Sequence, residues 1–68
     1  MRTFNLFIED DRYTVPTLAF VTARDKRAAL RLAMRRLEES PHHLCVEVCE
    51  GDDFLGHVAR NWREASEA

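Results

Sequence analysis

One stretch of this chain has the composition of an amphipathic helix, and it lies between stretches that alternate like strands. Residues 23–39 contain no glycine or proline and are rich in Ala, Leu, Arg, Met and Glu, which all favour helices. Thr22 is suited to cap the start of this helix, and Pro41 to stop it, because the residue before a proline is pushed out of helical geometry. A helix of this length with strands on both sides predicts a fold that mixes α and β structure.

The two faces of the predicted helix differ in chemistry. At about 100° per residue, one stripe is apolar and should pack against a sheet; it contains Ala29, Leu30, Ala33, Met34 and Leu37. The opposite side carries a row of arginines: Arg24, Arg27, Arg31 and Arg35. Residues 22–40 hold six cationic and three acidic side chains, a net charge of about +3, whereas the whole chain has a net charge of −2. We therefore expect a basic helix on an acidic body.

The arginine row has two interpretations. It can be an ordinary solvated helix face, or a docking surface for an acidic protein or for phosphates. A nucleic-acid-binding domain usually shows an overall basic excess, which this chain lacks. Nucleic acid is therefore the weakest of the partner hypotheses.

Three to four strands are expected around the helix. Residues 2–8 and 43–50 alternate between apolar and polar positions, and residues 13–21 are rich in β-branched and aromatic side chains. The short stretch 54–59 is the candidate for a fourth strand that pairs back on the third. Pro16 interrupts the stretch 13–21, so that strand should lie at a sheet edge or carry a bulge. The order β-β-α-β-β predicts an α+β two-layer sandwich with one antiparallel sheet, strand order 2-1-3-4, and the helix on one face.

One helix can cover only one face of such a sheet. We expect the covered face to form the core, from Phe4, Leu6, Ile8, Leu18, Phe20, Leu44, Val46 and Val48 packed against Leu30, Ala33, Met34 and Leu37. The open face would then show Asn5, Phe7, Ala19, Val21, Cys45, Glu47 and Cys49. Contiguous apolar surface of this kind usually marks an interaction site. A second copy, another protein, or Trp62 and the C-terminal tail could cover it.

The length and hydropathy of the chain limit its organisation. Sixty-eight residues make one small domain, 1–68, in which the polar residues 61–68 are expected to be a frayed tail or a short terminal helix. A core of this size is only marginally stable, so oligomerisation is a reasonable source of extra stability. The chain has no run of 18 apolar residues and no apolar signal core, and we expect a cytoplasmic protein.

No pattern of chemically active residues indicates an enzyme or a cofactor site. Cys45 and Cys49 would lie about 13 Å apart along one strand, too far for a disulfide or a shared metal ion. The spacing of His42, His43 and His57 matches no standard zinc site. The chain also lacks the usual nucleophile, phosphate-loop and dinucleotide motifs. We therefore expect no catalytic residue, no metal and no cofactor.

Two resemblances to known families rest on short motifs. Residues 4–10, the alanine-rich helix after Thr22, and the strand at 44–48 with Glu50-Gly51 after it resemble a family of short uncharacterised bacterial proteins. This resemblance covers most of the chain and implies the β-β-α-β-β fold, but no activity, because that family has none assigned.

The second resemblance covers about the first half of the chain. Asp11-Arg12-Tyr13, Val15-Pro16, Leu18 and the helix that follows Thr22 are similar to the HicB-type antitoxin domain. In that family a strand-strand-helix unit binds and blocks a small toxin RNase, so the resemblance implies a protein partner. The chain departs from the family in lacking the glycine pair of the hairpin, the Gly-Cys step and a DNA-binding appendage.

The sequence thus predicts a non-enzymatic protein-association module that forms a homodimer through its open sheet face. The alternative is an antitoxin-like or regulatory domain that binds another protein by charge complementarity. A weaker alternative is a protein that binds nucleic acid through the arginine row.

Overall fold

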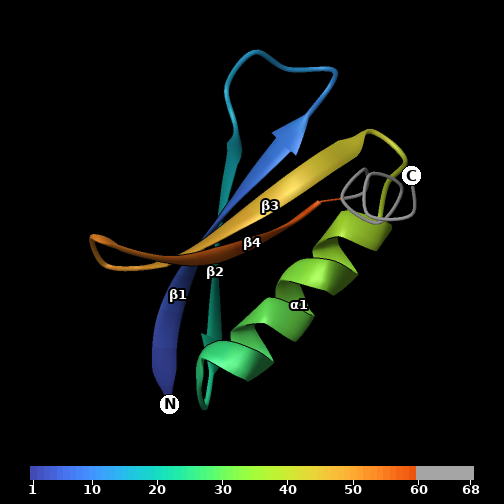
Figure 1. Ribbon diagram of the computed structural model, residues 1–68. Coiled ribbons are helices and arrows are strands. Elements are labelled where there is room, and N and C mark those ends of the chain that lie inside the picture. Colours follow the sequence, from blue (N-terminus) through green and yellow to red (C-terminus); the bar gives the residue numbers. More distant parts are fainter. Residues whose placement is uncertain (60–68) are drawn as a thin grey trace, which may run out of the picture.

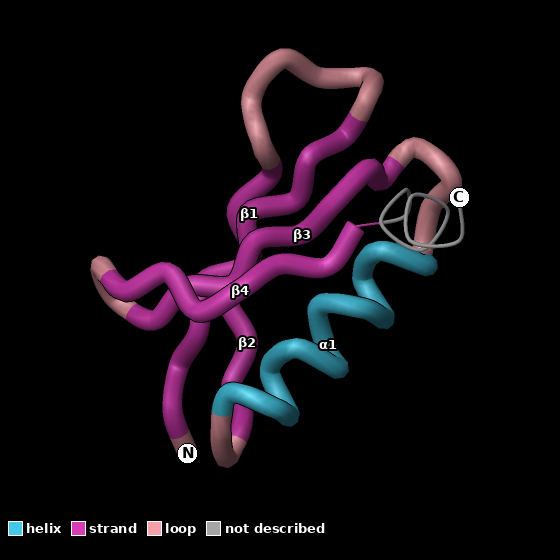
Figure 2. The backbone as a smooth tube through the Cα atoms, viewed as in Figure 1, coloured by secondary structure: helices cyan, strands magenta, loops and turns pink. Residues whose placement is uncertain are grey.

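The computed structural model of the protein describes residues 1–59. Its elements follow the chain in the order β1 (Arg2–Asp10), β2 (Thr17–Ala23), α1 (Lys26–Glu38), β3 (His43–Glu50) and β4 (Asp53–Ala59). The four strands form one layer and α1 forms the other, on one face of the sheet (Figure 1, Figure 2). The expected tail at 61–68, and Trp62 with it, lies outside the described residues.

The strands form one antiparallel sheet in the order β2-β1-β3-β4. β1 pairs with β2 on one side and with β3 on the other, and β4 pairs with β3. Because β2 and β3 both run antiparallel to β1, they run parallel to each other, and α1 connects them. The α+β fold and the strand order predicted from the sequence are confirmed.

The helix begins later than its sequence suggests. Asp25, not Thr22, is the N-cap: its Oδ1 accepts a hydrogen bond from the backbone N–H of Ala28 at 2.9 Å. Thr22 instead belongs to β2. The expected cap was wrong because Thr22 and Asp25 both have capping side chains, and only the length of β2 decides between them. The helix ends at Glu38, before Pro41, as that proline predicts.

The core lies between α1 and the two central strands. Phe4, Leu6, Val46 and Val48 are fully buried, and Ala33 meets them from α1. The small side chains of the helix stripe allow α1 to approach the sheet closely. The described residues that complete the buried cluster are Ile8, Ala23, Ala29 and Leu37.

The turn between β3 and β4 requires a glycine. Glu50 pairs with Asp53, which leaves Gly51 and Asp52 as a two-residue turn. Gly51 has φ +60°, in the left-handed region, whereas Asp52 has no positive φ. This is the pattern of a type II′ hairpin turn, which places glycine first. The turn sets the register of β4, and a bulge between Val48 and Cys49 adjusts it.

Candidate functional site

The register of the sheet decides which residues share the face that α1 leaves open. Directly paired residues of neighbouring strands point to the same side of a sheet. One row across the open face is Phe20, Asn5, Cys49 and Phe54, and the next is Leu18, Phe7, Glu47 and His57.

The structure corrects the predicted faces of β2. Leu18 and Phe20 were expected in the core, but they are 49% and 63% exposed on the open face. Ala19 and Val21 were expected on the open face, but they pack against the core on the side of α1. The assignment was wrong because neither set of β2 is polar, so alternation alone did not show which set faces the helix. Beneath the start of α1, the smaller residues of β2 face the helix.

Two further core assignments need correction. Leu44 is 42% exposed at the start of β3, and Met34 is 37% exposed on α1. Met34 lines a shallow hollow with Val58 and Ala59 of β4, so it faces the far edge of the sheet. The predicted placement of Phe7, Cys45, Glu47 and Cys49 on the open face agrees with the register.

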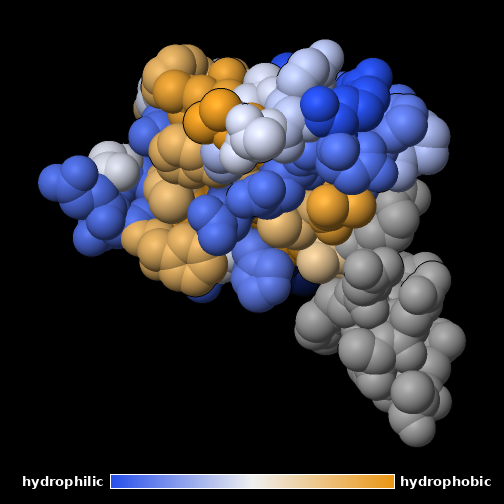
Figure 3. Space-filling view, turned by 90° about the horizontal axis from the view of Figure 1, so that it is seen from above, coloured by the Kyte–Doolittle hydropathy of each residue, from blue (hydrophilic) through white to orange (hydrophobic). Residues whose placement is uncertain are grey.

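The open face carries more large apolar surface than the sequence suggested. Phe54 is 59% exposed, and its ring stacks on that of His57 with centroids 6.4 Å apart. Together with Leu18, Phe20 and the half-buried Phe7, it makes up the apolar part of this face. In Figure 3 the apolar side chains gather on the left side of the molecule. We call these four residues the apolar patch.

The open face also carries two carboxylates. Glu9 and Glu47 are exposed on it, beside the two half-buried cysteines, which are free thiols. Burial, together with Glu9 and Glu47, raises the pKa of the Cys45 thiol. A raised pKa keeps the thiol protonated, and the protonated form is a poor nucleophile and metal ligand. Cys45 therefore fits a packing role better than a chemical one.

A cluster that the sequence did not suggest joins β1 to the start of β3. Asp10 is only 5% exposed, and it accepts hydrogen bonds from the backbone N–H and guanidinium of Arg12 at 2.7 to 3.0 Å. His43 Nε2 lies 3.7 Å from the same carboxylate, and His43 Nδ1 lies 2.6 Å from the carbonyl oxygen of Arg36. The cluster ties the end of α1 to the sheet, and its role is structural.

The arginine row separates into two groups in the structure. Arg24, Arg31 and Arg35 line an open hollow between the end of β2 and α1. Arg27 is exposed but does not line this hollow. Arg24 precedes the N-cap Asp25 and lies outside α1, which corrects its predicted place on the helix face. Only the position of β2 shows which of the four arginines share a surface.

The histidines and carboxylates do not come together as a metal site. His42 contacts Asp11 at 2.9 Å, while His43 is engaged with Arg36 and Asp10. Across residues 1–59, no three or more His, Cys, Asp or Glu side chains are grouped so that they could hold a metal ion. Within the same residues, no helix has the length and apolar character needed to cross a membrane.

Comparison with protein-family models, with curated proteins and with solved structures gave no match to this chain. The resemblances to a short bacterial family and to HicB-type antitoxins therefore stay predictions from short motifs.

Proposed function

We propose that this protein works by protein association, without chemistry of its own, and that its open sheet face binds a second copy of the chain. The observation that carries the proposal is the exposure of Leu18, Phe20 and Phe54 on one side of the sheet. Exposed large apolar side chains that lie together on one face are typical of interaction sites.

The positions of the aromatic residues favour a second copy over another protein. Phe20 on one edge strand and Phe54 on the other lie in the same row across the sheet. A twofold axis parallel to the strands, between β1 and β3, would place β2 of one copy over β4 of the other. Each Phe20 would then face Phe54 of the partner subunit, and aromatic pairs add to the stabilisation from burial. The two Glu47 carboxylates would not face each other.

The size of the face limits the contact area of this dimer. Four strands about 4.8 Å apart and seven residues at about 3.3 Å each give a flat footprint on the order of 400 Å². Stable interfaces bury about 800 Å² of accessible surface on each partner. Side chains that project from the sheet must therefore supply much of the contact area. An interface of this size lies at the small end of stable dimers, so the dimer should be tested through the micromolar range of concentration.

The two cysteines are compatible with this proposal. Cys45 and Cys49 are free, and both lie on the open face. A thiol behaves as a small apolar group when it is buried. Free thiols also persist in reducing compartments, which supports the cytoplasm as the place where the protein works.

Sedimentation velocity over a range of micromolar concentrations tests the proposal. The wild-type chain should approach twice its 7.9 kDa mass as concentration rises. Phe20→Glu places a charge in the apolar patch and should hold the protein at the monomer mass. Val15→Glu is the matched control, because Val15 is 71% exposed but lies in the loop before β2.

Two results would contradict the proposal. A wild-type monomer at every concentration would rule out the second copy as the partner. Equal dimerisation by the wild type and by Phe20→Glu would place the interface elsewhere on the molecule. Because Phe20 is mostly exposed, its replacement should leave the urea midpoint of the monomer nearly unchanged.

A further inference from the structure

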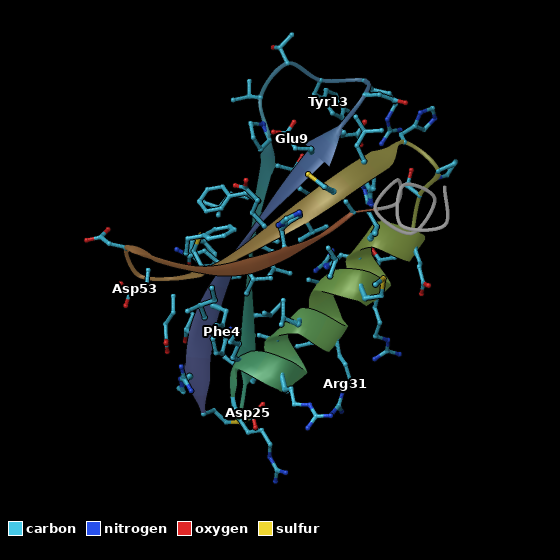
Figure 4. The ribbon with its side chains drawn as sticks, viewed as in Figure 1. Phe4, Glu9, Tyr13, Asp25, Arg31 and Asp53 are labelled. Atoms are coloured by element: carbon cyan, nitrogen blue, oxygen red, sulfur yellow. The ribbon has the colours of Figure 1, made fainter. Side chains whose placement is uncertain are left out.

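A second surface lies where α1 runs beside the end of β2. An open hollow of about 400 Å³ is lined by residues of both elements. Its lining combines apolar side chains and one threonine with cations: Met1, Ala23, Ala28, Leu32 and Thr22 with Arg24, Arg31 and Arg35. Figure 4 shows Arg31 at the same end of the molecule as Asp25, away from Glu9 and Tyr13. This surface is distinct from the open face of the sheet.

The charge of this hollow is not compensated from within the described chain. Arg2 and Arg12 each contact a carboxylate, at 2.6 and 2.7 Å. By contrast, no carboxylate of residues 1–59 lies within 4.0 Å of the guanidinium groups that line the hollow. Asp25, which follows Arg24, is engaged as the helix cap, and Glu39, four residues after Arg35, contacts Arg36 at 3.6 Å instead. Three adjacent cations without partners favour an anionic ligand.

The strand beside the hollow has an open edge. Among residues 1–59, β2 pairs only with β1, so its other edge presents unpaired backbone N–H and C=O groups. The strand Thr17–Ala23 contains no charged residue and no proline. Edges of natural sheets are commonly protected by such residues, and an edge without them readily accepts another strand. Several peptide-binding domains use an edge strand in this way.

We propose that the β2 edge binds an extended acidic segment of a partner protein, which adds as a fifth strand with its carboxylates against Arg24, Arg31 and Arg35. Alternate side chains of the added strand would point to the side of α1, as Ala19, Val21 and Ala23 do in β2. There they would meet the apolar and cationic lining of the hollow. The site does not rest on the proposed dimer, because face-to-face packing of two sheets leaves the β2 edges free.

A designed peptide tests strand addition directly. The probe is a blocked, dye-labelled peptide of alternating glutamate and valine, with binding measured by fluorescence anisotropy. The glutamate peptide should bind, and the same peptide with lysine in place of glutamate should not. Two further peptides carry N-methyl groups on either the glutamate or the valine amides. Only alternate amides of an added strand face the edge, so one of these two should lose binding and the other keep it.

Variants of the helix locate the binding site. Arg31→Glu with Arg35→Glu should weaken binding of the glutamate peptide by about tenfold, as expected for the loss of exposed ion pairs. Lys26→Glu with Arg27→Glu is the matched control: it changes the charge of α1 by the same amount outside the hollow. It should leave binding within about twofold of the wild type.

Hydrogen exchange distinguishes strand addition from binding that depends on charge alone. Peptide binding should slow the exchange of alternate backbone amides within Thr17–Ala23, because the new strand accepts their hydrogen bonds. The proposal is overturned if the glutamate peptide does not bind, or if both N-methylated peptides bind as well as the parent. It is also overturned if a thymidine oligonucleotide binds more tightly and depends on the same arginines, since the surface would then be a phosphate site.

Discussion

At the scale of single residues, Asp10 carries a charge at the edge of an apolar core. It is the one buried polar or charged residue within positions 1–59. The hydrogen bonds from Arg12 hold the pKa of the Asp10 carboxyl well below its ordinary value, although burial acts in the opposite direction. The carboxylate therefore stays ionised in the folded protein and anchors the loop after β1. A buried charge is tolerated only when it is paired in this way.

The lowered pKa of Asp10 predicts how stability depends on pH. In the unfolded chain an aspartate titrates near pH 4. Because the folded-state pKa lies lower, the ionised carboxylate stabilises the fold above about pH 4, and this contribution is lost as the pH falls toward the folded-state pKa. The melting temperature of the wild type should therefore fall on acidification from pH 6 to pH 2, measured by circular dichroism.

Asp10→Asn should melt lower than the wild type at pH 6 and show a smaller fall on acidification. Asp52→Asn is the control, since Asp52 is exposed in the β3–β4 turn and contributes the same charge. It should keep the wild-type dependence. Parallel curves for the wild type and Asp10→Asn would show that the pairing with Arg12 does not stabilise the fold.

Sequence patterns could not reveal the environment of Asp10. Residues 9–12 are all polar and suggest an exposed turn. The burial of Asp10 comes from a bulge at Glu9 and Asp10 in the pairing of β1 with β3, and from His43, which lies far away in the sequence. The partner Arg12 is only two residues away, but such local pairs are too common at turns to single out a buried charge.

At the scale of elements, the helix and the first three strands were predictable from the sequence, the fourth strand was left open, and the faces of β2 were not predictable. The inward faces of β1 and β3 were assigned correctly except at Leu44, which is 42% exposed at the start of β3. In β2 both faces are apolar, and size decides between them: Ala19, Val21 and Ala23 lie beneath the helix layer, while Leu18 and Phe20 point outward. Which face of β2 points to the helix depends on the distance between α1 and the sheet. No local sequence pattern predicts that distance.

The start of α1 can be tested by comparing its two candidate caps. Asp25→Ala removes the acceptor of the Ala28 N–H and should lower the free energy of unfolding by about 1 kcal/mol. For a chain of this size, that corresponds to a melting temperature lower by about 4–8 °C. Thr22→Ala should change stability by no more than about 0.5 kcal/mol, because Thr22 is exposed within β2.

Urea unfolding measures the free energy of unfolding of Asp25→Ala, of Thr22→Ala and of a third variant, Asp25→Ser. The serine hydroxyl can accept the same hydrogen bond, so Asp25→Ser should recover most of the lost stability. A larger loss for Thr22→Ala than for Asp25→Ala would show that the helix begins at the residue the sequence first suggested.

At the scale of the whole molecule, the two proposed surfaces differ in charge and lie on different sides. The open face combines the apolar patch with Glu9 and Glu47, and no lysine or arginine lies in the two rows that contain the patch. The hollow beside α1 carries the uncompensated arginines. The spatial separation follows from the topology, because α1 brings its charge to one layer of a two-layer fold. A dimer through the sheet would leave both arginine hollows free for a partner.

The most direct test of the account is isotope-filtered NMR on an equal mixture of labelled and unlabelled chains. At concentrations where the chain is dimeric, intermolecular nuclear Overhauser effects should join the rings of Phe20 and Phe54. These two rings lie on opposite edge strands of one sheet, so contacts between them must come from different copies. Intermolecular contacts confined to other surfaces, or none at all, would contradict the open sheet face as the interface.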